Sequence, residues 1–211
     1  MLLPIPTLEQ LIHEYYRFLL DECGYEVNQT EPMVDAFAEV VTFLPERPMR
    51  VIHIGCGQGE LLVFLASKFP GAIYRGVDAD TTKIAMARHL ADRLEVKVDW
   101  REGLLADLEL PSSYFNLMIV EGLGGIPTEQ WAPTIEESVR ITASEGHWMI
   151  HHLHRRGETV RFCPGKASVS LLELGVGTCL SFCNHKDGSE SIILKGVKRD
   201  PFVRHPSEAH A

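Results

Sequence analysis

Residues 51–59 constrain the fold more than any other part of this chain. They read Val-Ile-His-Ile-Gly-Cys-Gly-Gln-Gly, so an apolar run leads directly into Gly55, Gly57 and Gly59. Apolar residues with helical spacing follow over 60–69. A strand, a glycine turn and a helix in this order leave main chain that a ligand can approach, beside the positive end of a helix dipole. The segment predicts the ligand-binding turn of an α/β sheet.

The spacing of these glycines argues against a dinucleotide ligand. The dinucleotide fingerprint Gly-x-Gly-x-x-Gly requires its third glycine at position 60. That position holds Glu60, whose carboxylate would face an anionic pyrophosphate. NAD-linked oxidoreduction is therefore disfavoured.

The glycine pattern instead resembles the first motif of the class I methyltransferases, which use S-adenosylmethionine, and the resemblance extends over residues 50–198. The expected strands end in a hairpin, because the last two are joined by His185-Lys186-Asp187-Gly188 and Asp-Gly is a strong hairpin signal. The resemblance implies a three-layer α/β/α doubly wound fold whose seven-stranded, mostly parallel sheet closes with this antiparallel hairpin. The expected strands are 51–54, 72–77, 96–100, the end of 111–120, 145–150, 176–184 and 189–197, and the expected helices are 60–69, 81–93 and 131–142.

The resemblance also implies which residues bind the cofactor. Asp78, at the end of the second strand, is expected to bind the ribose hydroxyls through its two carboxylate oxygens. Capping of the next helix is the alternative role for this carboxylate, and Asp80 is the better candidate for the cap. The full expected set is Gly55, Cys56, Gly57, Gly59, Asp78, Ala79, Gly103, Leu104, Leu105 and Glu121.

Three positions depart from the family pattern. His53, Leu104 and Asn116 stand where acids are frequent in the family. Each missing contact could cost about 1 kcal/mol of cofactor binding. The chain is therefore either a methyltransferase with weakened cofactor affinity or a non-catalytic relative that keeps the fold as a binding or dimerisation module.

Candidate catalytic residues follow the fourth and fifth strands. Glu121 and His151 are candidates for a general base, and His152 and His154 are candidates for substrate contacts. Alternatively, the histidines form a packed or solvated cluster. His152 and His154 would share one face of a strand while His151 faces the other way, and no acid is adjacent in sequence, so no metal site is expected there.

The N-terminal segment is strongly acidic. Residues 1–49 hold nine acids and two bases, a net charge of −7 out of −9 for the whole chain. A helix over 8–19 and a second one over 33–44 are expected to form a lid on the site. Tyr15 and Tyr16 either pack on the sheet or face the cofactor and substrate. The acidic charge disfavours nucleic acid and favours a small neutral or cationic acceptor, although it also fits a solvated helix face.

Length and composition fit one domain over residues 1–198, a helical part over 1–49, a Rossmann-like core over 50–198 and a flexible tail over 199–211. Five cysteines without Cys-x-x-Cys spacing indicate reduced thiols and a cytoplasmic location. No apolar run is long enough to span a membrane. The expected function is methyl transfer from S-adenosylmethionine to a small molecule by in-line displacement, in a monomer or a homodimer.

Overall fold

The computed structural model describes residues 6–42, 44, 49–122, 130–154, 171–185 and 189–199. The described strands are Arg50–Ile54 (β1), Ile73–Asp78 (β2), Asp99–Glu102 (β3), Phe115–Val120 (β4), Thr142–His154 (β5), Val176–Asn184 (β6) and Glu190–Lys198 (β7). The described helices are Leu8–Asp21 (α1), Val27–Val41 (α2), Glu60–Lys68 (α3), Thr81–Arg93 (α4) and Trp131–Ile141 (α5), with a 3-10 turn at Leu105–Asp107 (η1).

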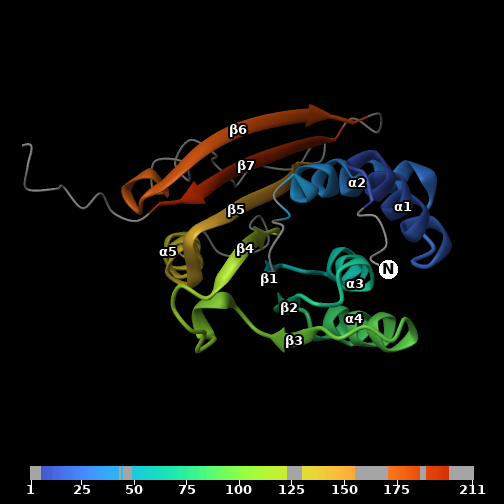
Figure 1. Cartoon of the computed structure of the whole chain (residues 1–211), viewed down its shortest axis with the longest axis horizontal. Coiled ribbons are helices and arrows are strands. Elements are labelled where there is room, and N and C mark those ends of the chain that lie inside the picture. Colours follow the sequence, from blue (N-terminus) through green and yellow to red (C-terminus); the bar gives the residue numbers. More distant parts are fainter. Residues whose placement is uncertain are drawn as a thin grey trace, which may run out of the picture.

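The strands form one seven-stranded sheet in the order β3-β2-β1-β4-β5-β7-β6 (Figure 1). The first five strands in this order are parallel to one another, while β7 is antiparallel to both β5 and β6. The predicted fold class, with its terminal antiparallel hairpin, is confirmed. The carboxyl ends of β1, β2, β3, β4, β5 and β6 therefore meet at one edge of the sheet, together with the amino end of β7.

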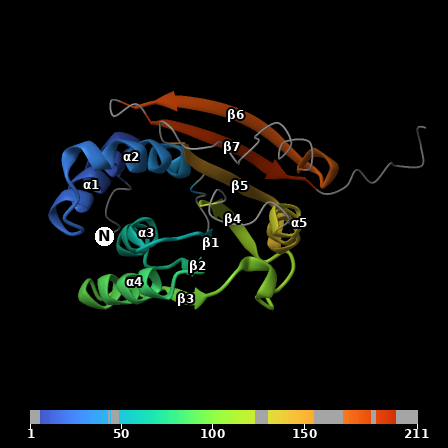
Figure 2. The same ribbon diagram turned by 180° about the vertical axis from the view of Figure 1, so that it is seen from behind.

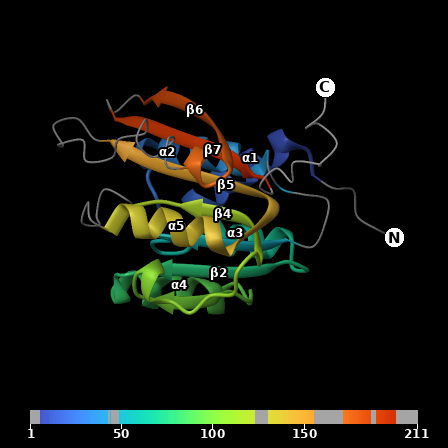
Figure 3. The ribbon, with the colours of Figure 1, turned by 90° about the vertical axis from the view of Figure 1, so that its left-hand side faces the viewer.

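Helices cover both faces of the sheet. One face packs against α1, α2, α3 and α4 around a cluster that includes Leu62, Phe64, Ile119 and Met149. The other face packs against α5 around Ile52, Met118 and Trp148. Figure 1 and the reverse view in Figure 2 both show α5 on the side opposite α3 and α4, and Figure 3 looks towards the face that carries α5.

The N-terminal helices differ in part from the prediction. A capping box between Thr7 and Gln10 starts α1 at Leu8, as the apolar periodicity indicates. The second helix was predicted to begin at residue 33, which is wrong, because α2 begins at Val27 and carries Pro32 inside it. A reciprocal cap between Glu26 and Gln29 starts this helix before Pro32. Because Pro32 then lies beyond the first turn, its missing N–H costs the helix one hydrogen bond.

Two strand boundaries also differ. The third strand was predicted over 96–100, but β3 covers Asp99–Glu102, because its register pairs Asp99 with Arg75 of β2. An ion pair of 2.6 Å between these two side chains reinforces that register. The fifth strand extends further than predicted in both directions, so His151, His152 and His154 lie inside β5 rather than at and beyond its end. The hairpin turn at 186–188 and the tail from 200 lie outside the described residues.

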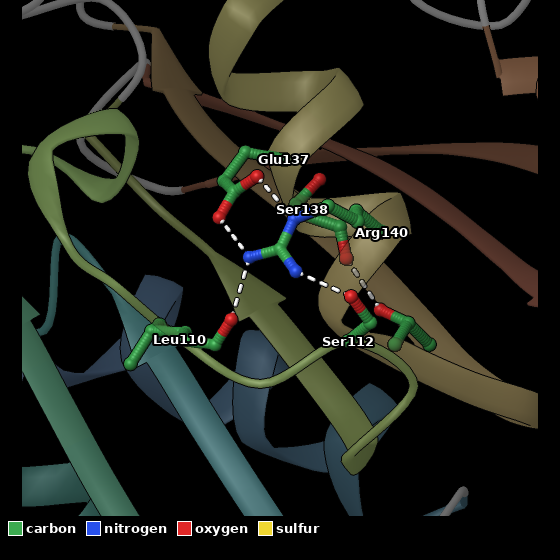
Figure 4. A network of polar contacts seen from close by, with 6 residues as sticks. Leu110, Ser112, Glu137, Ser138 and Arg140 are labelled. Atoms are coloured by element: carbon green, nitrogen blue, oxygen red, sulfur yellow. Dashed lines mark hydrogen bonds and ion pairs between the residues drawn. The ribbon is translucent and has the colours of Figure 1, made fainter.

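Arg140 fastens α5 to the segment that leads into β4 (Figure 4). Its guanidinium donates to the carbonyl oxygen of Leu110 at 2.6 Å and to the hydroxyl of Ser112, while Glu137 holds it from the same helix. On the buried side of α5, the indole N–H of Trp148 donates to Ser138 Oγ at 3.1 Å. These contacts fix α5 between β4, which Glu121 directly follows, and β5, which contains His151.

Candidate functional site

The turn after β1 is held by the end of β2. The backbone N–H groups of Gly55 and Cys56 donate to the carbonyl oxygen of Val77 at 2.7 and 3.0 Å. The N–H of Gly57 donates to Asp78 Oδ2 at 2.8 Å. The glycine turn and the acid that the sequence singled out therefore form one unit.

The three glycines of this turn serve different purposes. Gly57 has φ +58° and a Cβ placed on it would meet nothing within 4 Å, so its face is open. A Cβ on Gly55 would lie 2.2 Å from the carbonyl oxygen of Glu121, and one on Gly59 would lie 2.5 Å from the ring of Trp100. Gly55 and Gly59 thus allow close packing inside the protein, whereas Gly57 leaves main chain exposed to a ligand.

Asp78 is half-buried and its carboxylate is oriented by the backbone. Oδ2 accepts from Gly57 and Oδ1 accepts from the N–H of Asp80 at 2.9 Å. Asp80 caps α4 by accepting from the N–H groups of Thr82 and Lys83. The helix cap is thus Asp80, and the carboxylate of Asp78 is left with lone pairs that can accept from hydroxyl groups.

A cavity of about 280 Å³ lies at this edge of the sheet and contains seven of the predicted cofactor residues. It is lined by Ile54, Gly55, Val77, Asp78, Ala79, Asp80, Lys83, Gly103, Leu104, Leu105, Glu121, Gly122 and Thr134. Cys56, Gly57 and Gly59 belong to the same turn without lining the cavity, and the thiol of Cys56 is buried. Burial raises the pKa of that thiol well above its usual range, which leaves it a packing group.

Glu121 lies between two histidines. Its Oε1 is 2.7 Å from Nδ1 of His151, and its Oε2 is 3.2 Å from Nε2 of His53. Burial alone would raise the pKa of Glu121, but the two histidines outweigh burial and lower the pKa well below its usual range. Glu121 therefore stays ionised at neutral pH and is a poor proton acceptor.

His151 connects Glu121 to the β6–β7 hairpin. Its Nε2 lies 3.0 Å from Ser191 Oγ, which in turn lies 2.7 Å from Nε2 of His185. The carboxylate, imidazole and hydroxyl follow the order found in serine hydrolases. Ser191 is fully buried, however, and is shared with a second histidine, so it cannot reach a substrate as a nucleophile.

The two tyrosines are placed differently. Tyr15 is buried and packs between Phe37 and Phe64, with ring centroids 4.2 and 5.1 Å away. This placement corresponds to the packing alternative. Tyr16 lines a groove of about 840 Å³ together with residues of α2 and its cap, including the acids Glu26, Glu31 and Asp35.

The remaining predicted histidines lie near the end of β5. His152 is buried and pairs in register with Ile192, and His154 is half-buried opposite Glu190. They point to the sheet face opposite that of His151, as strand geometry requires. The structure thus brings His151 to Glu121 and separates His152 and His154 from that contact.

The sequence did not predict two buried contacts. The hydroxyl of Tyr25 donates to Glu60 Oε1 at 2.6 Å, so Glu60 points towards the N-terminal helices, and burial raises its pKa. His53, which replaces a frequent acid, lies beside Glu121 of the neighbouring strand. No spacing rule predicts either contact, although the parallel register of β1 and β4 could have suggested the second one. Asn116 accepts from the N–H of Arg50 at 2.7 Å and so has a structural role.

Comparison with known proteins agrees with this geometry. Residues 51–146 match the family described as "Methyltransferase domain". The release factor glutamine methyltransferase of Caulobacter vibrioides is 32% identical over 121 residues, which are 54% of this chain and 38% of that protein. The trans-aconitate 2-methyltransferase of Mycobacterium tuberculosis is 26% identical over 107 residues, which are 51% of this chain and 30% of that protein.

Solved structures extend the likeness to nearly the whole fold. Magnesium protoporphyrin IX methyltransferase from Synechocystis, solved with S-adenosylhomocysteine, superposes with a TM-score of 0.68 at 16% identity and covers 89% of this chain and 94% of that one. The cyclase SpnF superposes with a TM-score of 0.66 at 15% identity over 94% and 99% of the two chains. These likenesses show the fold.

The resemblance to the class I methyltransferases is thereby confirmed: the chain has their sheet order, and its central part matches their domain family. The matched segments span about a third of the length of the two curated relatives. In the part of the chain that the structure describes, none of the helices has the length and apolar character needed to cross a membrane.

Proposed function

We propose that this protein transfers a methyl group from S-adenosylmethionine to a small-molecule acceptor. The observation that carries the proposal is the open turn at Gly57, whose N–H fixes the carboxylate of Asp78 at the mouth of a cavity. Main chain without a Cβ beside an oriented acid is the arrangement that a nucleoside with an attached amino acid requires. The family match supports the same activity.

The residues present fit this cofactor despite the three missing acids. Asp78 would accept from the ribose hydroxyls, and Gly103, Leu104 and Leu105 would flank the adenine. Glu121 lies at the carboxyl end of the strand next to β1, 3.2 Å from His53, and would supply the negative charge that position 53 lacks. An ammonium group gains from an ionised carboxylate in a partly dry site.

The bound cofactor would supply a methyl carbon already activated by a positively charged sulfur. The protein then has to orient the two reactants and exclude water, which is the larger part of catalysis in an in-line displacement. Glu121 is held by two histidines and His151 by Glu121 and Ser191, so both predicted bases are already hydrogen-bonded. We infer that Glu121 acts through its fixed charge and that the acceptor is an amine or thiolate needing little proton abstraction.

The proposed acceptor is small and neutral or cationic. Three acids line the groove beside Tyr16, so this surface would repel a nucleic-acid backbone. The trans-aconitate methyltransferase, a curated relative, acts by its name on a small molecule. A homodimer and a cytoplasmic location stay predictions.

The proposal is tested by offering S-adenosylmethionine with a labelled methyl group to three acceptor pools. These are a low-molecular-weight cell extract, total nucleic acid and total protein. Label is expected in the first pool and lost with Asp78→Asn. Label confined to protein or nucleic acid would overturn the acceptor class.

A second function is favoured by a specific observation. The acids that many relatives use are absent at 53, 104 and 116, and the cyclase SpnF shares the fold, so the fold alone does not fix methyl transfer. A non-catalytic binding module would show no label in any pool. It would also keep its cellular role when Asp78 and Gly57 are replaced.

A further inference from the structure

Three metal-ligating side chains meet where α2 contacts the end of the hairpin. Asp35 of α2, Cys183 near the end of β6 and His185 just after it place ligand atoms within 4.8 Å of one another. Asp35 Oδ2 lies 3.1 Å from Cys183 Sγ and 3.4 Å from His185 Nδ1. The side chain of His185 is 1% exposed, whereas Asp35 is partly open to solvent at 38%. The cluster is therefore anchored on a buried imidazole and can be reached from outside.

The imidazole of His185 has a nitrogen without a hydrogen bond inside this cluster. Its Nε2 contacts Ser191, but its Nδ1 makes no hydrogen bond to any residue that the structure describes. Nδ1 is buried, and its nearby polar neighbour is the carboxylate of Asp35. A buried polar atom in this position costs free energy unless a further partner satisfies it.

The contacts that run from Glu121 to His185 leave Nδ1 of His185 as the nitrogen that faces Asp35. Glu121 lies 2.7 Å from Nδ1 of His151, and the Ser191 hydroxyl contacts Nε2 of His151 at 3.0 Å and Nε2 of His185 at 2.7 Å. Nδ1 of His185 therefore points at the carboxylate and thiol of the cluster, and a metal ion placed there would be the partner that this buried nitrogen lacks.

We propose that Asp35, Cys183 and His185 bind a divalent zinc-like metal ion that joins the N-terminal helical pair, α1 and α2, to the β6–β7 hairpin. Thiolate, imidazole and carboxylate are all ligands of Zn²⁺, and a mixed sulfur and nitrogen set selects it over Mg²⁺ or Ca²⁺. Three protein ligands leave a fourth tetrahedral position for water. On binding, the ion takes the place of the thiol proton that Cys183 now donates to Asp35, and this proton leaves to solvent.

Ser191 would orient the imidazole of His185 in this site through a contact of 2.7 Å to Nε2. A metal-ligating histidine commonly has its second nitrogen held by a hydrogen bond that fixes the tautomer and the ring orientation. Ser191 does this for His185 and at the same time contacts His151. The metal site is thus connected through one hydroxyl to the Glu121 cluster at the cavity. The proposal does not depend on methyl transfer.

The test is a titration of the untagged full chain with Zn²⁺, followed by calorimetry, and with Co²⁺, followed by absorption. One equivalent of Zn²⁺ is expected to bind, and bound Co²⁺ should show a thiolate charge-transfer band. Cys183→Ser should abolish the band, and His185→Gln and Asp35→Asn should abolish stoichiometric Zn²⁺ binding. Ser191→Ala should weaken it about tenfold. Cys179→Ser is the matched control, because Cys179 is an exposed free cysteine of the same strand, and it should bind like the wild type.

Thermal unfolding separates loss of the site from loss of the fold. Zn²⁺ should raise the unfolding temperature of the wild type and of Cys179→Ser but not of Cys183→Ser, while all three should unfold cooperatively without metal. Absence of saturable Zn²⁺ binding to the cooperatively folded wild type would overturn the proposal. Equal Zn²⁺ affinity in Cys183→Ser and Cys179→Ser would overturn it as well, because the metal would then bind elsewhere.

Discussion

Gly57→Ala should abolish most cofactor binding while leaving the fold nearly intact. The backbone at Gly57 has φ +58°, and the added methyl group would meet no protein atom within 4 Å. The cost to stability is therefore the left-handed backbone alone, about 1 to 2 kcal/mol. For a chain of this size that corresponds to a fall in unfolding temperature of roughly 2 to 8 °C.

The effect on binding is larger, because the methyl group occupies the space where the ligand would lie. Overfilling a close contact typically costs about 1 to 3 kcal/mol. The dissociation constant of S-adenosylhomocysteine should therefore rise about 5- to 150-fold.

Two other glycines provide controls. Gly24 has φ +74° and is equally open, but it lies in the connection between α1 and α2, so Gly24→Ala should show the same loss of stability and normal binding. Gly59→Ala should be the least stable, because its Cβ would lie 2.5 Å from the ring of Trp100.

Isothermal calorimetry with S-adenosylhomocysteine and thermal unfolding, on all three variants and the wild type, check this expectation. Equal affinity in Gly57→Ala and Gly24→Ala would refute the reasoning, because the turn would then not contact the ligand.

Four further substitutions are informative. Asp78→Asn should weaken S-adenosylhomocysteine binding by about 1.5 to 3 kcal/mol in calorimetry, whereas Asp80→Asn should bind normally, because asparagine is an equally good helix cap. Glu60→Gln should stabilise the protein increasingly as the pH rises above 4.5, since burial raises the pKa of Glu60 and its ionisation then opposes folding. Glu121→Gln should destabilise it at neutral pH, and this loss should shrink as the pH falls below 4.5, since the pKa of Glu121 is lowered in the folded state. Urea unfolding of both variants and the wild type across this pH range measures the two differences, and pH-independent differences would contradict the assignments.

Much of the fold could be predicted because its signals are local. The glycine turn, the acid that ends β2 and the Asp-Gly hairpin each depend on residues close in sequence. Two boundary errors have different causes, one between neighbouring strands and one local. An Arg75–Asp99 pair between strands sets the start of β3, and a reciprocal cap at Glu26 overrides the helix-breaking effect of Pro32.

The polar cluster could not be predicted in the same way. His53, Glu121, His151, Ser191 and His185 come from β1, the end of β4, β5, β7 and the end of β6, and they meet only once the sheet has formed. Sequence spacing placed Glu121 and His151 separately at the site edge but gave no distance between them. It assigned no role at the site to Ser191 or His185. Contacts across neighbouring strands depend on register, which local spacing does not encode.

A crystal structure with S-adenosylhomocysteine tests the central claim most directly. The account predicts both ribose hydroxyls within hydrogen-bond distance of Asp78, the adenine between Gly103 and Leu105, and the amino-acid end against Gly57 with its ammonium towards Glu121. A nucleoside bound elsewhere, or Asp78 without contact to the sugar, would contradict it.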